Sequence, residues 1–101
     1  MKEIIDIPNA WKNISDLFVA LGDEQRQRIL LSFEKNERLN ILQIVASSKL
    51  SRTAVTHHLK VLHNSGALQS EKIGKEVFFW LDKQFMIQNI HAELNYIHEE
   101  I

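Results

Sequence analysis

Apolar residues recur every three or four positions along much of this 101-residue chain, which is the period of helices with one buried face. The pattern predicts a first helix over residues 8–21 and a second over about 23–36. Pro8 suits a helix start, Gly22 ends the first helix and the Asp23 carboxylate caps the second. The apolar residues expected to face the core are Trp11, Ile14, Leu17, Phe18 and Leu21 in the first helix, and Ile29, Leu30 and Phe33 in the second.

Two short helices follow, separated by a turn of three residues. Asn40 and Gln43 have the spacing of a capping box, which predicts a third helix over about 40–48. Ser51 is a good cap for a fourth helix over 52–65, because its hydroxyl can accept from the free amides of the first turn. Two short helices joined in this way are typical of a helix-turn-helix.

The helix predicted over 52–65 has two different faces. One face is apolar and should be buried, through Val55, Leu59 and Leu62. The other face gathers hydrogen-bond donors near the helix start, namely Arg52, Thr53, Thr56, His57 and Lys60. Residues 40–65 thus have the pattern of a helix-turn-helix motif, which inserts its second helix into the major groove of DNA.

After Gly66 the pattern changes to that of strands. Residues 68–73 and 76–81 flank Gly74, and the second run is rich in residues that favour β-structure. The pattern predicts a β-hairpin within a wing over residues 67–82, with two lysines near its tip, Lys72 and Lys75.

The last predicted helix starts after Asp82 and carries a long apolar stripe through Ile101. The domain core is accounted for elsewhere, so the stripes of the first and last helices predict a two-fold dimer interface, built from segments 1–21 and 83–101. The interface residues that we expect are Trp11, Ile14, Ile87, Ile90, Leu94 and Ile97.

Composition narrows the class of protein. The length suits one domain, and a chain without cysteine has no disulfide, thiolate metal site or thiol switch. No apolar run approaches the ~18 residues of a membrane helix, and the N-terminus lacks a signal-peptide core, so we expect a cytoplasmic protein without a membrane partner. No nucleophile–base group or phosphate-cradling glycine loop is present, and we expect no enzyme.

Charge is unevenly distributed, although the net value is only −1. Residues 1–48 have a balance of −1, residues 49–75 a balance of +4 and residues 76–101 a balance of −4. Positive charge therefore surrounds the predicted reading helix, the helix over 52–65 that would enter the major groove, as binding to DNA phosphates requires.

Several motifs in their order and spacing resemble the ArsR-type winged-helix repressors, the arsenical-resistance and metal-sensor family of bacteria. The match covers about residues 17–82 and rests on Leu17–Asp23, Arg26, Arg28–Leu30, Leu50–Leu62, Ser65–Gly66 and Gly74–Phe79. The resemblance implies a mainly α winged helix-turn-helix over residues 1–101, with about five helices and a two-stranded wing. It also implies a homodimer whose reading helices enter successive major grooves of double-stranded DNA, roughly 34–36 Å apart.

The same resemblance assigns the DNA contacts. Arg52 could form two hydrogen bonds with one guanine, whereas Thr53 and Thr56 could contact bases or phosphates. The expected DNA-binding residues are Ser51, Arg52, Thr53, Thr56, His57, Lys60, Lys72 and Lys75.

Metal sensing departs from the family pattern. Many relatives bind metal through cysteines near the third helix, and residues 40–48 contain none. Others bind zinc or nickel on the last helix, but here Asn89 replaces a carboxylate and Ile101 stands where the partner of His98 would be. His91 and His98 share a helix face and stay candidate metal ligands. We expect no cofactor, and the effector, metal or small molecule, is left open.

The sequence thus predicts a transcriptional regulator, a dimeric repressor on a palindromic operator. Two alternatives stay open: a zinc- or nickel-responsive repressor, and a winged-helix module that binds another protein. The basic segment argues against the second alternative.

Overall fold

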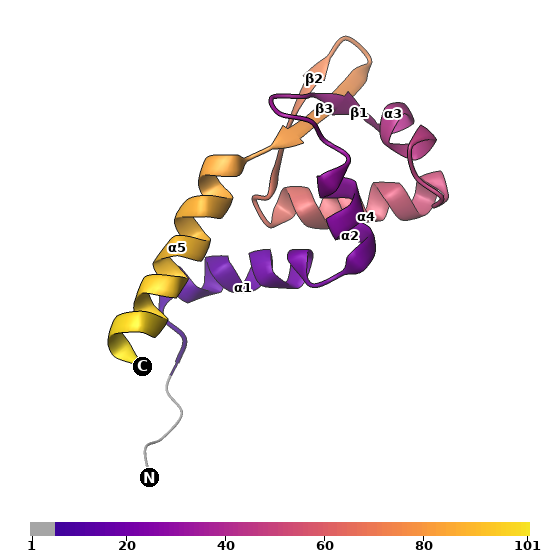
Figure 1. Cartoon of the computed structure of the whole chain (residues 1–101). Helices are drawn as coiled ribbons and strands as arrows, with labels where there is room; N and C mark the ends of the chain where they lie inside the picture. The colour runs from indigo at the N-terminus through magenta and orange to yellow at the C-terminus, as the bar shows by residue number, and fades with distance from the viewer. Residues whose placement is uncertain (1–5) are drawn as a thin grey trace.

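Five α-helices and three short strands make up the part of the chain that this computed structural model describes, residues 6–101 (Figure 1). Residues 1–5 of the predicted dimerisation segment lie outside it. The helices are α1 (Asn9–Leu21), α2 (Glu24–Leu31), α3 (Ile41–Ala46), α4 (Arg52–Asn64) and α5 (Lys83–Glu100). The strands are β1 (Leu39–Asn40), β2 (Leu68–Ile73) and β3 (Glu76–Leu81).

The helix caps predicted from the sequence are present. The Asp23 carboxylate accepts from the amides of Gln25 and Arg26 at 2.9 and 3.1 Å, and the hydrogen bond from the Arg26 amide is the main reason why its pKa lies below the ordinary value of 3.8. Asn40 and Gln43 form the reciprocal capping box that begins α3. Local sequence therefore determines where most of the helices begin.

The core forms around α4, which the other elements surround. Val55, Leu59 and Leu62 are almost completely buried, as the helical period predicts. They pack in one cluster with Leu17 of α1 and Ile44 of α3. This burial fixes which side of α4 remains available to a partner.

The sheet has one strand more than predicted. Its order is β1–β3–β2, all antiparallel, and β1 adds to the hairpin by pairing Leu39 with Phe79 and Asn40 with Phe78. The second helix is also shorter than predicted, because α2 ends at Leu31 and the chain then turns to reach β1, with Asn36 at a φ of 61°. The predicted two-stranded wing is thus the projecting part of a three-stranded sheet.

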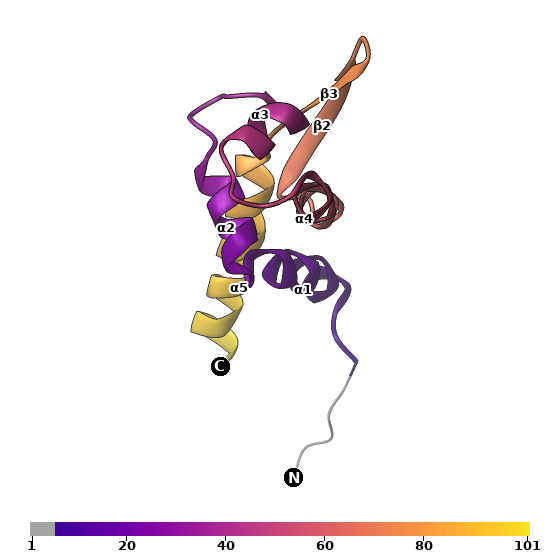
Figure 2. The same cartoon turned by 90° about the vertical axis from the view of Figure 1, so that its right-hand side faces the viewer.

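Helix α5 runs away from the sheet and crosses the N-terminal part of α1, where the two helices touch (Figures 1 and 2). Trp11 of α1 and Tyr96 of α5 meet edge to face, with ring centroids 5.1 Å apart. The stripe of α5 predicted to be apolar remains uncovered in the single chain, because Ile87 and Leu94 are each 59% exposed.

Candidate nucleic-acid interface

The donor face of α4 lies on the surface. Ser51 caps the helix by accepting from the Ala54 amide at 3.2 Å, which fixes the start of the first turn. The five residues predicted to face DNA from this helix are all exposed: Arg52, Thr53, Thr56, His57 and Lys60. The face opposite the core therefore offers cationic, hydroxyl and imidazole groups together.

The wing stands next to this face (Figure 2). The imidazole Nε2 of His63 lies 3.1 Å from the Ser70 hydroxyl, which joins the end of α4 to β2. Thr56 and Lys60 line a hollow of about 230 Å³ between the helix and the sheet. Sequence reasoning missed this link, because no local pattern pairs residues 63 and 70.

A second hollow of about 240 Å³ brings together groups from three elements. Arg52 of α4 and Lys75 of the wing both line it, beside Asn40 at the start of α3. The two cations are distant in the sequence but share one surface with an acidic neighbour, Glu76.

The tip of the wing is basic and exposed. Gly74 has a φ of 64°, which allows the tight turn between β2 and β3. Lys72 and Lys75 are exposed on either side of it. The one acidic residue of the basic segment 49–75, Glu71, forms an ion pair with Arg38 at 2.8 Å, so its charge is offset from outside the segment.

His57 is followed in α4 by a second histidine, His58, which has different surroundings. His58 is partly buried, and its Nδ1 lies 3.3 Å from Nη1 of Arg26. The Arg26 guanidinium also donates to the carbonyl groups of Ala20 and Val19, at 2.8 and 3.1 Å. Arg26 thus ties α4 to the end of α1, while His57 stays exposed.

The predicted dimer residues divide into two groups. Ile14 is only 3% exposed and packs in the chain's own core, so it has little surface to offer a second copy. Trp11 is partly buried against Tyr96. The predicted residues of α5 are exposed: Ile87, Ile90, Leu94 and Ile97.

The donor groups do not fit a thiolate metal centre. The chain has no cysteine, and no group of three or more histidine or acidic side chains that could hold a metal ion occurs among the described residues. The two candidate ligands, His91 and His98, are both exposed on α5.

A helix-turn-helix whose second helix is exposed beside a projecting hairpin defines a winged helix-turn-helix protein. Across the described residues, every helix is too short or too polar to span a bilayer. The class of fold and the basic donor face together point to binding of nucleic acid.

Comparisons with known proteins show which family the chain resembles. A family model for the bacterial regulatory proteins of the arsR family matches residues 23–70. The transcriptional repressor SmtB homolog of Synechocystis sp. is 25% identical over 92 residues, which cover 91% of this chain and 67% of that protein. The cadmium resistance transcriptional regulatory protein CadC of Listeria innocua is 30% identical over 78 residues, covering 77% of this chain and 65% of that protein.

The fold agrees with these relatives. An ArsR-like transcriptional regulator from Rhodococcus sp. superposes with a TM-score of 0.81 at 24% identity, covering 92% of this chain and 86% of the other. These matches support an ArsR-type DNA-binding transcriptional regulator. This type consists of regulators rather than enzymes.

Proposed function

We propose that the protein is a dimeric repressor that occupies a palindromic operator and blocks transcription. The observation that carries the proposal is the shared surface of α4 and the wing, where Arg52 and Lys75 line one hollow and Thr56 and Lys60 line the other. Cations there would bind phosphates, and the exposed donors at the start of α4 would reach base edges.

Dimerisation is supported by the exposed α5 stripe. Three of its residues, Ile87, Leu94 and Ile97, are 48–59% exposed, and α5 lies beside α1. Apolar residues at this spacing are costly to leave in water, and a second copy of the chain would cover them. A two-fold dimer presents two α4 helices, which suits an operator with inverted half-sites.

The relatives' metal response does not transfer to this chain through thiolates, since it has no cysteine. We therefore propose that the protein represses without a cysteine metal site, although its relative from Listeria innocua is a cadmium resistance transcriptional regulatory protein.

The basic face is tested by the salt dependence of DNA binding. In the variant Lys60→Gln/Lys75→Gln we expect the slope of log K against log salt to fall by about two units, because each phosphate contact contributes about 0.9. Fluorescence anisotropy of a labelled duplex at several salt concentrations measures the slope.

The matched control is Lys12→Gln/Lys35→Gln, which removes the same charge from α1 and from the turn after α2. We expect its slope to remain within half a unit of the unmodified protein's, to which a charge away from the contact surface adds little. Equal losses in both variants would show that net charge, and not this surface, drives binding.

A further inference from the structure

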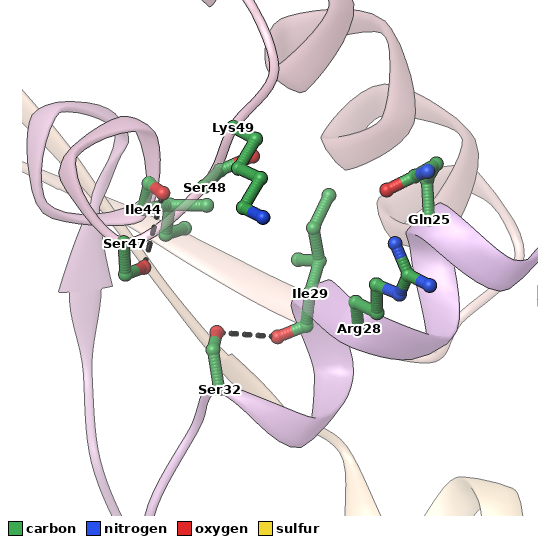
Figure 3. A pocket seen from close by; sticks show the side chains of 8 residues that line it. All are labelled: Gln25, Arg28, Ile29, Ser32, Ile44, Ser47, Ser48 and Lys49. Carbon is green, nitrogen blue, oxygen red and sulfur yellow. Dashed lines mark hydrogen bonds between the residues drawn. The ribbon is translucent and has the colours of Figure 1, made fainter.

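A cavity of about 400 Å³ lies between α2 and the end of α3, and none of the residues predicted to contact DNA lines it. Figure 3 shows its two walls, one from α2 and its C-terminal end and the other from Ile44 of α3 and the turn after it, with the Lys49 ammonium group directed into the space between them. The lining residues are Gln25, Arg28, Ile29, Ser32, Ile44, Ser47, Ser48 and Lys49. The volume falls in the range of small-molecule sites.

The floor of the cavity is apolar. Ile29 and Ile44 are 4% and 1% exposed, so they belong to the core and form a fixed surface beneath the opening. A polar wall above an apolar floor suits a compound with a charged head and a short apolar body.

Two cations stand at the walls without acidic partners. Within the described part of the chain neither Arg28 nor Lys49 forms an ion pair or a side-chain hydrogen bond, whereas the nearby Arg26 donates to two carbonyl groups. Two uncompensated cations beside one opening favour an anion, and a guanidinium can bind a carboxylate or phosphate with two parallel hydrogen bonds.

Neutral donors add to this preference. The Ser48 hydroxyl accepts from the Leu50 amide at 3.0 Å, which leaves its own hydrogen free to donate. The hydroxyl groups of Ser32 and Ser47 instead donate to helix carbonyls, at 2.6 and 3.1 Å, so they contribute less to binding an anion.

The cavity is also connected to the reading helix. Ser47, Ser48 and Lys49 belong to the short turn between α3 and α4, which ends at the Ser51 cap. A ligand held there adds negative charge to the basic segment and contacts the turn that positions α4.

We propose that this cavity binds a small organic anion, a carboxylate or phosphate with a short apolar body, and that its occupancy weakens DNA binding. The binding part stands on the cavity alone, whereas the effect on DNA rests on the proposed function.

The binding arm uses benzoate, phenyl phosphate and inorganic phosphate as probes of ¹⁵N-labelled protein. We expect the organic anions to shift the amide signals of Ser32, Ser48 and Lys49 in a saturable manner, and benzamide, the neutral counterpart of benzoate, to leave them unchanged. Arg28→Gln/Lys49→Gln should weaken binding at least tenfold, while Lys12→Gln/Lys35→Gln should bind as the unmodified protein does. The two cavity cations make no contacts that the fold needs, so the variant should fold.

Three results would overturn the binding proposal: no saturable shift with any probe, an equal response to benzamide, or shifts confined to α4 and the wing. In the DNA arm, benzoate at saturation should weaken duplex binding about fivefold relative to chloride at the same ionic strength. That ratio should return to one in Arg28→Gln/Lys49→Gln, and a ratio of one in the unmodified protein would overturn the coupling. A protein that binds benzoate but no DNA would refute the proposed function and leave the anion site standing.

Discussion

At the scale of single residues, the proposed DNA-binding face of α4 depends on exposed side chains such as Arg52. Arg52 in the first turn of α4 is exposed, whereas Arg26 is held by Ala20, Val19 and His58. The two arginines thus differ in their surroundings, because Arg26 points into the fold and Arg52 points away from it. The free guanidinium can fork onto a guanine in the major groove.

Arg52→Ala should therefore reduce specific affinity by roughly 1–3 kcal/mol and reduce discrimination at one base pair. Titration of the operator and of single-base operator variants measures both effects. The control Lys12→Ala, on the exposed side of α1, should leave discrimination unchanged. If Arg52→Ala weakened binding to every duplex by the same factor, Arg52 would contact phosphate and not a base.

At the scale of elements, the sequence was sufficient to predict those helices and strands that are defined by local capping residues and by the spacing of apolar residues. The order of the helices, the capping box at Asn40 and the hairpin around Gly74 were all predicted and are confirmed. Strand β1 was not predicted, because two residues are too few to show a period and their pairing with Phe78 and Phe79 is distant in sequence. The end of α2 was placed too late for a related reason, since Phe33 continues the apolar spacing beyond the last helical turn.

The junction between α4 and the wing contains a glycine that lies close to a side chain of α5. Gly66 has a φ of 89°, and a Cβ there would lie 2.5 Å from Cε1 of Phe85 in α5. Gly74 also has a positive φ, but a Cβ there would meet nothing within 4 Å. Substituting each glycine by alanine therefore distinguishes backbone strain, which both changes cause, from steric overlap, which only the change at Gly66 causes.

Gly66→Ala should lower the free energy of unfolding by about 2–4 kcal/mol, from backbone strain and overpacking together. Gly74→Ala should lower it by only about 1–2 kcal/mol, from backbone strain alone. Urea denaturation followed by circular dichroism gives both values. Equal losses would mean that Phe85 moves aside at little cost.

At the scale of the whole molecule, the proposed repressor is a dimer and requires a second copy of the chain. The apolar stripe of α5 is exposed, and Trp11 of α1 lies next to α5 through its contact with Tyr96. The sequence pattern of the stripe indicated an interface, but it could not show that Ile14 points into the chain's own core. Likewise the exposed face of α4 could be predicted from the helical spacing of one segment. The cavity between α2 and α3 joins residues from two segments, so it could be found only in the folded chain.

Leu94→Glu should shift the protein from dimer to monomer, because a two-fold interface would bury this carboxylate twice without a partner. Light scattering after size-exclusion chromatography measures the mass. Leu31→Glu is the matched control, since Leu31 is 83% exposed at the end of α2 and should leave the mass unchanged. A dimer that persisted in Leu94→Glu would place the interface elsewhere.

The most direct test of the central claim is a titration of the purified protein against the DNA upstream of its own gene. Scrambled duplex serves as competitor at about 0.15 M salt, where non-specific binding is weak. A sequence-specific repressor should bind tightly in the presence of the competitor, with one dimer on each operator. Binding that the scrambled duplex abolishes, for this segment and for a random library of duplexes alike, would contradict a sequence-specific repressor.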